Sequence, residues 1–271
     1  MSGVAYDFAD GAATLTLDRP DRGNSLDPDC VNGLLDAIRR ARREDARVVV
    51  LRADGRAFCV GGDVDAMAAA PDRERHIDDL AETLHRAISE LHQLDAIVVS
   101  VVQGVAAGAG VPLAAAADLV LAARSARFTL AYTKIGLSPD GGSTLLTASL
   151  GLHRALHLAL LNPMLTAEEA CAAGLVAQVH PDDQLGDAAA AVVAQLLAGS
   201  RTAQVTAKRL LRAQAIPSPE SALRRETLAI RAAADGPDAE EGLRAFLAKR
   251  PPVFPSAVQR SIDLTGAADA R

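Results

Sequence analysis

Aromatic residues are scarce in this 271-residue chain, at 3% with no tryptophan, while hydrophobic residues make up 49%. The interior must therefore be built mainly from alanine, valine and leucine. No apolar run reaches about 18 residues without a charge or a breaker, so we expect no membrane-spanning helix. The first ten residues lack the basic and apolar segments typical of a signal peptide. We expect a cytoplasmic protein.

Cysteine is also rare and never paired in sequence. Cys30, Cys59 and Cys171 lie far apart and form no C-x-x-C motif, which favours reduced thiols over a disulfide framework or a zinc site. His153 and His157 stand four residues apart but lack the glutamate of an H-E-x-x-H motif, and we predict no metal. The formal net charge is −6 without a basic tract, which argues against nucleic acid as a partner.

Strand and helix signals alternate over the first two thirds of the chain. Residues 4–8 and 13–17 read as a hairpin that turns at Asp10-Gly11, and Asp27-Pro28 is a typical helix start. A strand at 47–52 follows. Further short strands are expected at 118–123, 126–130 and 175–179, and Thr166-x-x-Glu169 is a capping box that starts a helix before the last of them. This alternation predicts an α/β fold.

A long helix is expected over 77–94. Its His85 and His92 are interpreted as solvated or capping side chains. Beyond Pro181 the pattern is helical only, and we place a boundary near residue 195. The helices expected there cover 182–199, 201–214, 219–234 and 238–249.

The chain centres on a β-branched strand at 98–102 that runs into a small-residue turn at 104–110 and a helix near Pro112. Such a turn leaves the amides of Ala109 and Gly110 free to bind an oxyanion or a phosphate. The alternative is a close strand–helix crossing that simply needs small residues.

Two more blocks accompany this turn. Phe58-Cys59-x-Gly61-x-Asp63, Gln103-Gly104-x-Ala106-x-Gly108-x-Gly110 and Gly136-Leu137-x-Pro139-Asp140-x-Gly142 follow one another in order. Together they resemble the enoyl-CoA hydratase/isomerase (crotonase) family over about residues 4 to 250. The third block is similar to that of isomerase-type members with a Pro-Asp-x-Gly loop.

The resemblance implies a crotonase-like spiral of ββα units, assembled into trimers or hexamers. Residues 1–195 would form the α/β core with an acyl-CoA site. Residues 196–271 would form a C-terminal helical trimerisation region and tail, which in the family packs onto a neighbouring subunit. No cofactor is expected, because coenzyme A is part of the substrate.

Family chemistry places a thioester oxygen between two backbone amides while an enolate forms, and the matching positions are Gly62 and Ala109. Ala109 replaces a more usual glycine, which preserves the N–H if its backbone angles are ordinary. The resemblance assigns contacts with CoA or the acyl group to Arg22, Gly23, Asn24, Gly61, Asp63, Gly108, Gly110, Pro112, Phe246 and Lys249.

The two glutamates of the hydratases are replaced by Pro112 and Tyr132, so water addition is disfavoured. Asp140 remains as a carboxylate that can move a proton from C2 to C4, which predicts a 3-enoyl to 2-enoyl isomerase. Tyr132 is the next candidate. Asp140 as a helix cap is the structural alternative. The functional alternatives are a non-catalytic acyl-CoA-binding protein, or another enolate reaction such as hydration, C–C cleavage or thioester hydrolysis.

Overall fold

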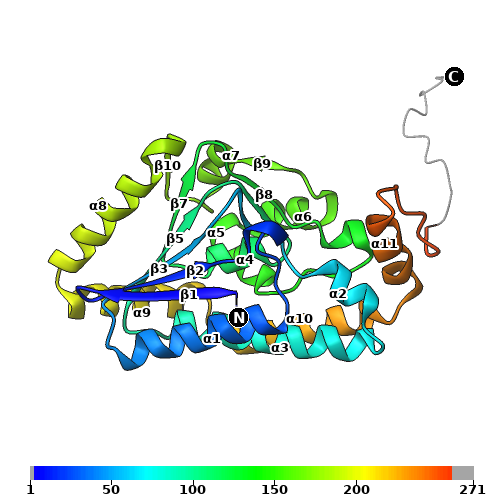
Figure 1. Cartoon of the computed structure of the whole chain (residues 1–271), viewed down its shortest axis with the longest axis horizontal. Helices are drawn as coiled ribbons and strands as arrows, with labels where there is room; N and C mark the ends of the chain where they lie inside the picture. The colour runs from blue at the N-terminus through cyan, green and yellow to red at the C-terminus, as the bar shows by residue number, and fades with distance from the viewer. Residues whose placement is uncertain (1–2, 258–271) are drawn as a thin grey trace, which may run out of the picture.

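A computed structural model describes residues 3–257 of the chain. Its larger sheet has six strands (Figure 1). The first two form an antiparallel hairpin and the other neighbours are parallel. In sheet order the strands are β1 (Val4–Ala9), β2 (Ala12–Leu17), β3 (Val48–Ala53), β5 (Ile97–Val102), β7 (Leu119–Ala123) and β10 (Gln178–His180).

A second sheet is built from four very short strands. Its strands are β4 (Ala57–Cys59), β6 (Val105–Ala107), β8 (Arg127–Thr129) and β9 (Leu165–Thr166). Strands β4, β6 and β8 directly follow β3, β5 and β7 of the larger sheet. The chain therefore repeats a unit of two strands followed by a helical segment. This arrangement confirms the predicted α/β spiral. The short strands themselves were not predicted, except at 126–130.

Helices enclose the sheets. The α-helices are α1 (Pro28–Arg43), α2 (Val64–Ala69), α3 (Arg73–His92), α4 (Gly110–Ala115), α5 (Thr147–Leu150), α6 (Leu152–Leu161), α7 (Ala167–Ala172), α8 (Leu185–Ala198), α9 (Arg201–Ala215), α10 (Pro219–Ala234) and α11 (Pro237–Leu247). The 3-10 turns are η1 (Pro20–Arg22), η2 (Tyr132–Ile135), η3 (Ser143–Leu146) and η4 (Asp182–Gln184). Asp27 caps α1 as expected, and Thr166 with Glu169 forms the expected capping box of α7.

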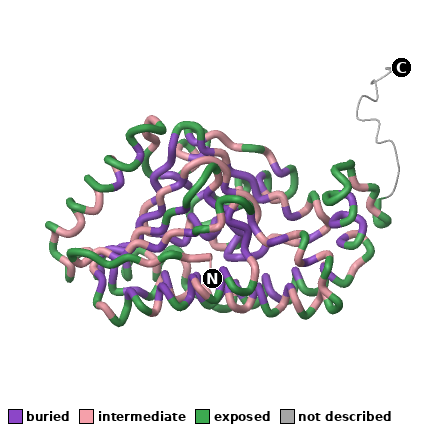
Figure 2. The backbone as a smooth tube through the Cα atoms, in the orientation of Figure 1, coloured by how far each residue is buried: buried purple, intermediate pink, exposed green. Residues whose placement is uncertain are grey.

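Successive side chains of the central strands point to opposite faces of the sheet and belong to two separate hydrophobic clusters. Val49 and Leu51 of β3 face the main core with α1 and α3, whereas Val48 faces a smaller cluster with Leu185 and Ala189 of α8. Figure 1 shows α8 apart from α1, α3 and α10, which run together along the opposite side. The buried segments in Figure 2 are concentrated between these helices.

One expectation needs correction. The last strand was predicted at 175–179, but Leu175 and Val176 are buried core residues, and pairing with β7 begins at Gln178. Within the chain, α10 packs along α3, and α11 packs on α2 and η2. Packing of the C-terminal helices onto a neighbouring subunit stays a prediction. Within residues 3–257, no helix has the length and apolar character needed to cross a membrane.

Candidate active site

Two glycine turns from different strand–helix units meet at the centre of the molecule. Gly61 has a φ of 93°, and a Cβ built there would lie 3.0 Å from the Ala107 oxygen and 3.4 Å from the Ala109 nitrogen. Only glycine fits this position, because the left-handed backbone and the close approach both exclude a side chain. The sequence blocks around Gly61 and Ala109 are therefore in direct contact.

Among residues 3–257, the N–H groups of Gly62 and Ala109 have no backbone acceptor. Leu26 donates its N–H to the Gly61 oxygen at 2.8 Å, and Asp63 donates to the Leu26 oxygen at 2.9 Å, so the N–H of Gly62 between them faces away from Leu26. Ala109 precedes the first turn of α4 with φ −62° and ψ −16°, the ordinary helical backbone that the prediction required. Gly62 and Ala109 line the same cavity.

That cavity, which we call the acyl cavity, has a volume of about 110 Å³. It is walled by aliphatic side chains from several elements, including Met67 of α2, Leu84 of α3 and Ile230 of α10. Among its lining residues only Tyr132 and Asp140 have oxygen-bearing side chains. The cavity thus joins two free amides, one carboxylate and an apolar wall.

Asp140 reaches the cavity from the loop between η2 and η3. Its backbone oxygen accepts hydrogen bonds from the Ser143 hydroxyl at 2.6 Å and the Tyr132 hydroxyl at 2.9 Å. Its carboxylate makes no capping bond to η3; Oδ1 lies 3.0 Å from Nε2 of His85, without a well-aligned hydrogen bond. The capping alternative for Asp140 is therefore not supported by the structure.

This loop has two buried partners that were not predicted from the sequence. His85 is 5% exposed and Glu226 of α10 is 2% exposed, and His85 Nε2 lies 3.5 Å from Oε2 of Glu226. Burial lowers the pKa of His85, but the close carboxylates of Asp140 and Glu226 outweigh it and raise the pKa to about 9. The expectation of a solvated or capping His85 was wrong.

A usable signal for both was present. His85 follows Leu84 and precedes Ile88 on the apolar face of α3, and Glu226 lies between Leu223 and Ile230 on the apolar face of α10. A titratable side chain within an apolar stripe is placed in the core by the helix itself.

The hydroxyl of Tyr132 supports the loop that holds Asp140. Burial, with the charges of Asp140 and Glu226, raises the pKa of its phenol well above the usual value. The hydroxyl therefore stays protonated and donates to the Asp140 oxygen. A phenol that stays protonated is a poor general base.

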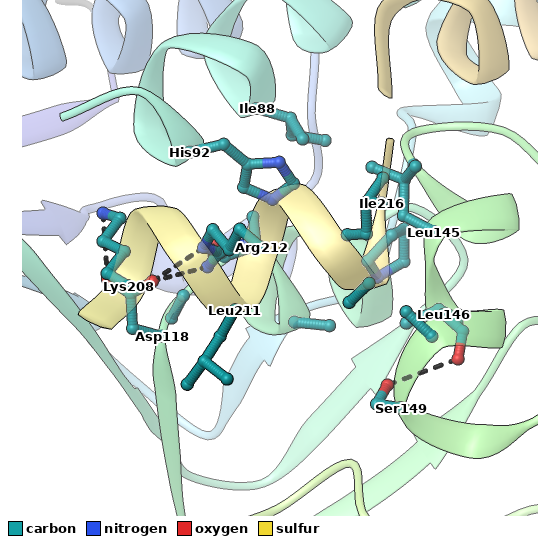
Figure 3. A pocket seen from close by; sticks show the side chains of 17 residues that line it. Ile88, His92, Asp118, Leu145, Leu146, Ser149, Lys208, Leu211, Arg212 and Ile216 are labelled. Carbon is teal, nitrogen blue, oxygen red and sulfur yellow. Dashed lines mark hydrogen bonds and ion pairs between the residues drawn. The ribbon is translucent and has the colours of Figure 1, made fainter. Parts of the chain in front are cut away.

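Pro112 is not in the acyl cavity, contrary to the predicted substrate contact. It lines a second cavity of about 340 Å³ beside α9, drawn in Figure 3. Its polar side is closed by the ion pairs of Lys208 and Arg212 with Asp118, at 3.0 and 2.8 Å. His92 lies there too, and burial followed by the charge of Arg212 lowers its pKa to about 3. His92 is therefore neutral.

The predicted CoA residues divide into two groups. Arg22 and Phe246 line an outer cavity of about 470 Å³, and Phe246 also lines the acyl cavity. Asp63 borders the outer cavity, but Oδ1 caps α2 through the Ala66 N–H and Oδ2 pairs with Arg22 at 3.3 Å. Lys249 is exposed and lines neither cavity.

The remaining predicted positions lie in the turns around the site. Asn24 is buried, and its side chain binds the backbone of Arg19, Asp54 and Ala57, so it fixes the shape of the loop. Gly23 accepts the N–H of Val60. Gly108 lines the acyl cavity, whereas Gly110 lies against β4, where a Cβ would meet the Cys59 oxygen at 2.2 Å.

Cys59 and the cluster of His85, Asp140 and Glu226 are the other candidate reactive groups. Burial raises the pKa of Cys59 to about 12, so the thiol stays protonated. His85, Asp140 and Glu226 have potential ligand atoms within 4.8 Å of one another. Both Glu226 oxygens accept N–H groups, from Gly142 and Thr144, each at 2.7 Å. Asp140 Oδ1, by contrast, has no aligned hydrogen-bond partner among the described residues.

Comparison with known proteins agrees with this geometry. The family description "Enoyl-CoA hydratase/isomerase" matches residues 7–257. The chain is 40% identical to the 1,2-epoxyphenylacetyl-CoA isomerase of Escherichia coli K12 over 90% of this chain and 95% of that protein. It is 39% identical to a probable enoyl-CoA hydratase of Rhodobacter capsulatus, over 93% and 97%.

The fold is also similar to that of a solved structure. The enoyl-CoA hydratase of Mycobacterium avium subsp. paratuberculosis K-10 superposes with a TM-score of 0.85 at 36% identity, covering 93% of this chain and 98% of that one. Because the family description matches residues 7–257 and a relative is 40% identical over 90% of the chain, this chain belongs to the enoyl-CoA hydratase/isomerase family.

Proposed function

We propose that this protein shifts the double bond of an enoyl-CoA from the 3-enoyl to the 2-enoyl position, with Asp140 as the proton shuttle. The observation that carries the proposal is the content of the acyl cavity. Asp140 is the single acid among its lining residues, and it shares the cavity with the free amides of Gly62 and Ala109. One carboxylate and one oxyanion site are sufficient for a 1,3-proton shift.

The reaction runs in two proton transfers. The Asp140 carboxylate takes a proton from C2, and the C2–H electrons move into the thioester to give an enolate. The N–H groups of Gly62 and Ala109 hold the developing oxyanion; each such donor is typically worth about 10² to 10³ in rate. The protonated Asp140 then delivers the proton to C4, the double bond moves to C2–C3, and the carboxylate is restored.

Water addition is less well supported. A hydratase of this family would use two acids, and the positions that match them hold Pro112, which lines the other cavity, and Tyr132, whose hydroxyl binds the Asp140 oxygen. Neither can activate water at neutral pH. No cofactor beyond the CoA of the substrate is required by the proposed steps.

The cavity also bears on the acyl group. Its volume of about 110 Å³ is slightly smaller than the apolar cavity of about 150 Å³ that holds one benzene ring in another protein. Apart from Asp140 and Tyr132 it offers no polar side chain for substituents. We propose a short or cyclic apolar acyl group. The 40% identity to an isomerase named for 1,2-epoxyphenylacetyl-CoA favours that cyclic thioester as the second candidate substrate.

The test is a substrate panel with the purified protein. It contains 3-hexenoyl-CoA, crotonyl-CoA, 3-decenoyl-CoA and 1,2-epoxyphenylacetyl-CoA, with thioester conjugation followed by ultraviolet absorbance and products by mass spectrometry. We expect isomerisation of 3-hexenoyl-CoA and little hydration of crotonyl-CoA. Rapid hydration without isomerisation would contradict the proposal.

The non-catalytic alternative needs its own measurement. A saturated acyl-CoA is incubated with the protein in heavy water, and deuterium at C2 is measured. Because Asp140 faces the amides that acidify the C2 proton, we expect exchange in the wild type. Tight acyl-CoA binding without either exchange or isomerisation would identify a carrier protein.

A further inference from the structure

His85, Asp140 and Glu226 come from three distant segments and meet beside the acyl cavity. His85 lies on α3, Asp140 in the loop before η3 and Glu226 on α10, and their potential ligand atoms all lie within 4.8 Å of one another. All three residues are at most 5% exposed. Two carboxylates this close, with little water, repel each other unless a positive charge or a proton is shared among them.

The three side chains are not equally free to act. Glu226 is anchored by the N–H groups of Gly142 and Thr144 and by the Thr144 hydroxyl. Asp140 Oδ1 has no aligned hydrogen bond and faces His85 Nε2 at 3.0 Å. Since Asp140 also lines the acyl cavity, its other oxygen is the one left for a substrate.

The two ring nitrogens of His85 differ in their hydrogen bonding: Nδ1 has one fixed partner, whereas Nε2 lies close to both an acceptor and a donor. Thr227 donates its hydroxyl to the Leu223 oxygen at 3.3 Å, so it accepts a hydrogen bond from Nδ1–H of His85 at 3.0 Å. At the other end, Nε2 lies 3.0 Å from Asp140 but also 3.2 Å from the N–H of Gly141. A single nitrogen cannot donate to Asp140 and accept from Gly141 at once.

These contacts are compatible with two protonation states of the His85 imidazole. With a proton on Nε2, His85 is a cation that faces the Asp140 and Glu226 carboxylates. Without it, the Nε2 lone pair accepts the Gly141 N–H, and no positive charge lies between the imidazole and the two carboxylates. The titratable groups around the imidazole are Asp140 from the loop and Glu226 from α10, with Tyr132 of η2 beyond Asp140.

We propose that His85 is a positioning residue for the proton shuttle: as an imidazolium it holds the Asp140 carboxylate ionised and turns one of its oxygens toward the acyl cavity. The proposal rests on the function proposed above. In an apolar cavity an isolated aspartate is easily neutralised, and a protonated aspartate cannot take the C2 proton. A cation 3.0 Å from Oδ1 favours the carboxylate form that the shuttle requires.

The test uses His85→Gln, which retains a side-chain N–H donor of similar reach but removes the positive charge. His92→Gln is the matched control, because His92 lies on the same helix, is half-buried and neutral, and lines the cavity beside α9 instead of the acyl cavity (Figure 3). The dependence of kcat/KM on pH is measured for the wild type and both variants, and melting temperatures report on folding.

An opposite charge at this distance lowers the pKa of a carboxyl by about 1 to 3 units. We therefore expect the acidic limb of the kcat/KM profile of His85→Gln to move up by about one pH unit or more, with recovery toward wild-type activity at high pH. His92→Gln should keep the wild-type limb. A folded His85→Gln variant with an unmoved limb would overturn the proposal.

A second measurement does not depend on catalysis. Histidine-selective NMR of the whole protein follows the titration of His85 in the wild type and in Asp140→Asn. We expect His85 to remain protonated through pH 8 in the wild type and to titrate at lower pH in Asp140→Asn. An unchanged His85 titration would overturn the pairing. If instead the wild type isomerises no thioester while this shift is seen, the proposed function fails and the pairing stands.

Discussion

Glu226 connects helix α10 to the loop that holds Asp140. Its replacement by glutamine is a quantitative test of that connection. The carboxylate accepts the Gly142 N–H through Oε2 and the Thr144 N–H through Oε1, each at 2.7 Å, and the Thr144 hydroxyl as well. Glutamine has one accepting oxygen. One of the two buried N–H groups must therefore face an NH₂ group.

The magnitude follows from these contacts. A buried donor without an acceptor costs about 1 to 3 kcal/mol. The bonds that remain lose the assistance of the negative charge, which roughly doubles the strength of such bonds. We expect Glu226→Gln to lower the free energy of unfolding by about 2 to 4 kcal/mol. For a chain of this size that corresponds to a fall in melting temperature of about 5 to 15 °C.

The assay is thermal unfolding followed by circular dichroism, with Glu220→Gln as the control. Glu220 lies on the same helix, but its carboxylate accepts bonds from Ser89 and Gln93 at the surface. Surface substitutions change stability little, so the control should melt within about 2 °C of the wild type. Equal melting temperatures for Glu226→Gln and Glu220→Gln would refute the anchoring role of Glu226.

Two further predictions concern Tyr132 and the exposed leucines. Tyr132→Phe removes a donor to the Asp140 oxygen, but Ser143 still donates to that oxygen, so we expect a loss of about 0.5 to 1.5 kcal/mol in stability and less than about a tenfold fall in isomerisation rate. A fall of about 10² or more would reassign proton transfer to Tyr132. We also propose self-association into a trimer or hexamer, because Leu210, Leu211 and Leu161 are 68%, 72% and 70% exposed. Light scattering at micromolar concentration measures this, and a stable monomer would contradict it.

Much of the fold could be predicted because its signals are local. The hairpin at Asp10-Gly11, the cap at Asp27 and the capping box at Thr166 all act through neighbouring residues. The strands at 57–59 and 105–107 could not be recognised, because three residues inside a glycine turn show no periodicity and pair only through tertiary contact.

The site was predictable to the same extent. The motifs grouped Gly62, Ala109 and Asp140, and in the structure all three line the acyl cavity. The meeting of His85 with Glu226 joins residues 141 positions apart, and no local pattern reports such a distance. Pro112 was misplaced because a motif position gives the residue number but not the face of α4 from which its ring projects.

The central claim is that Asp140 moves the proton, and the paired behaviour of Asp140→Asn measures it most directly. Asparagine preserves the shape of the side chain but removes its basicity. The isomerisation rate with 3-hexenoyl-CoA is compared with the wild type, while acyl-CoA affinity and melting temperature are measured on the same samples. We predict a rate at least about 10²-fold lower with affinity and stability largely retained. Isomerisation by Asp140→Asn at the wild-type rate would contradict the account.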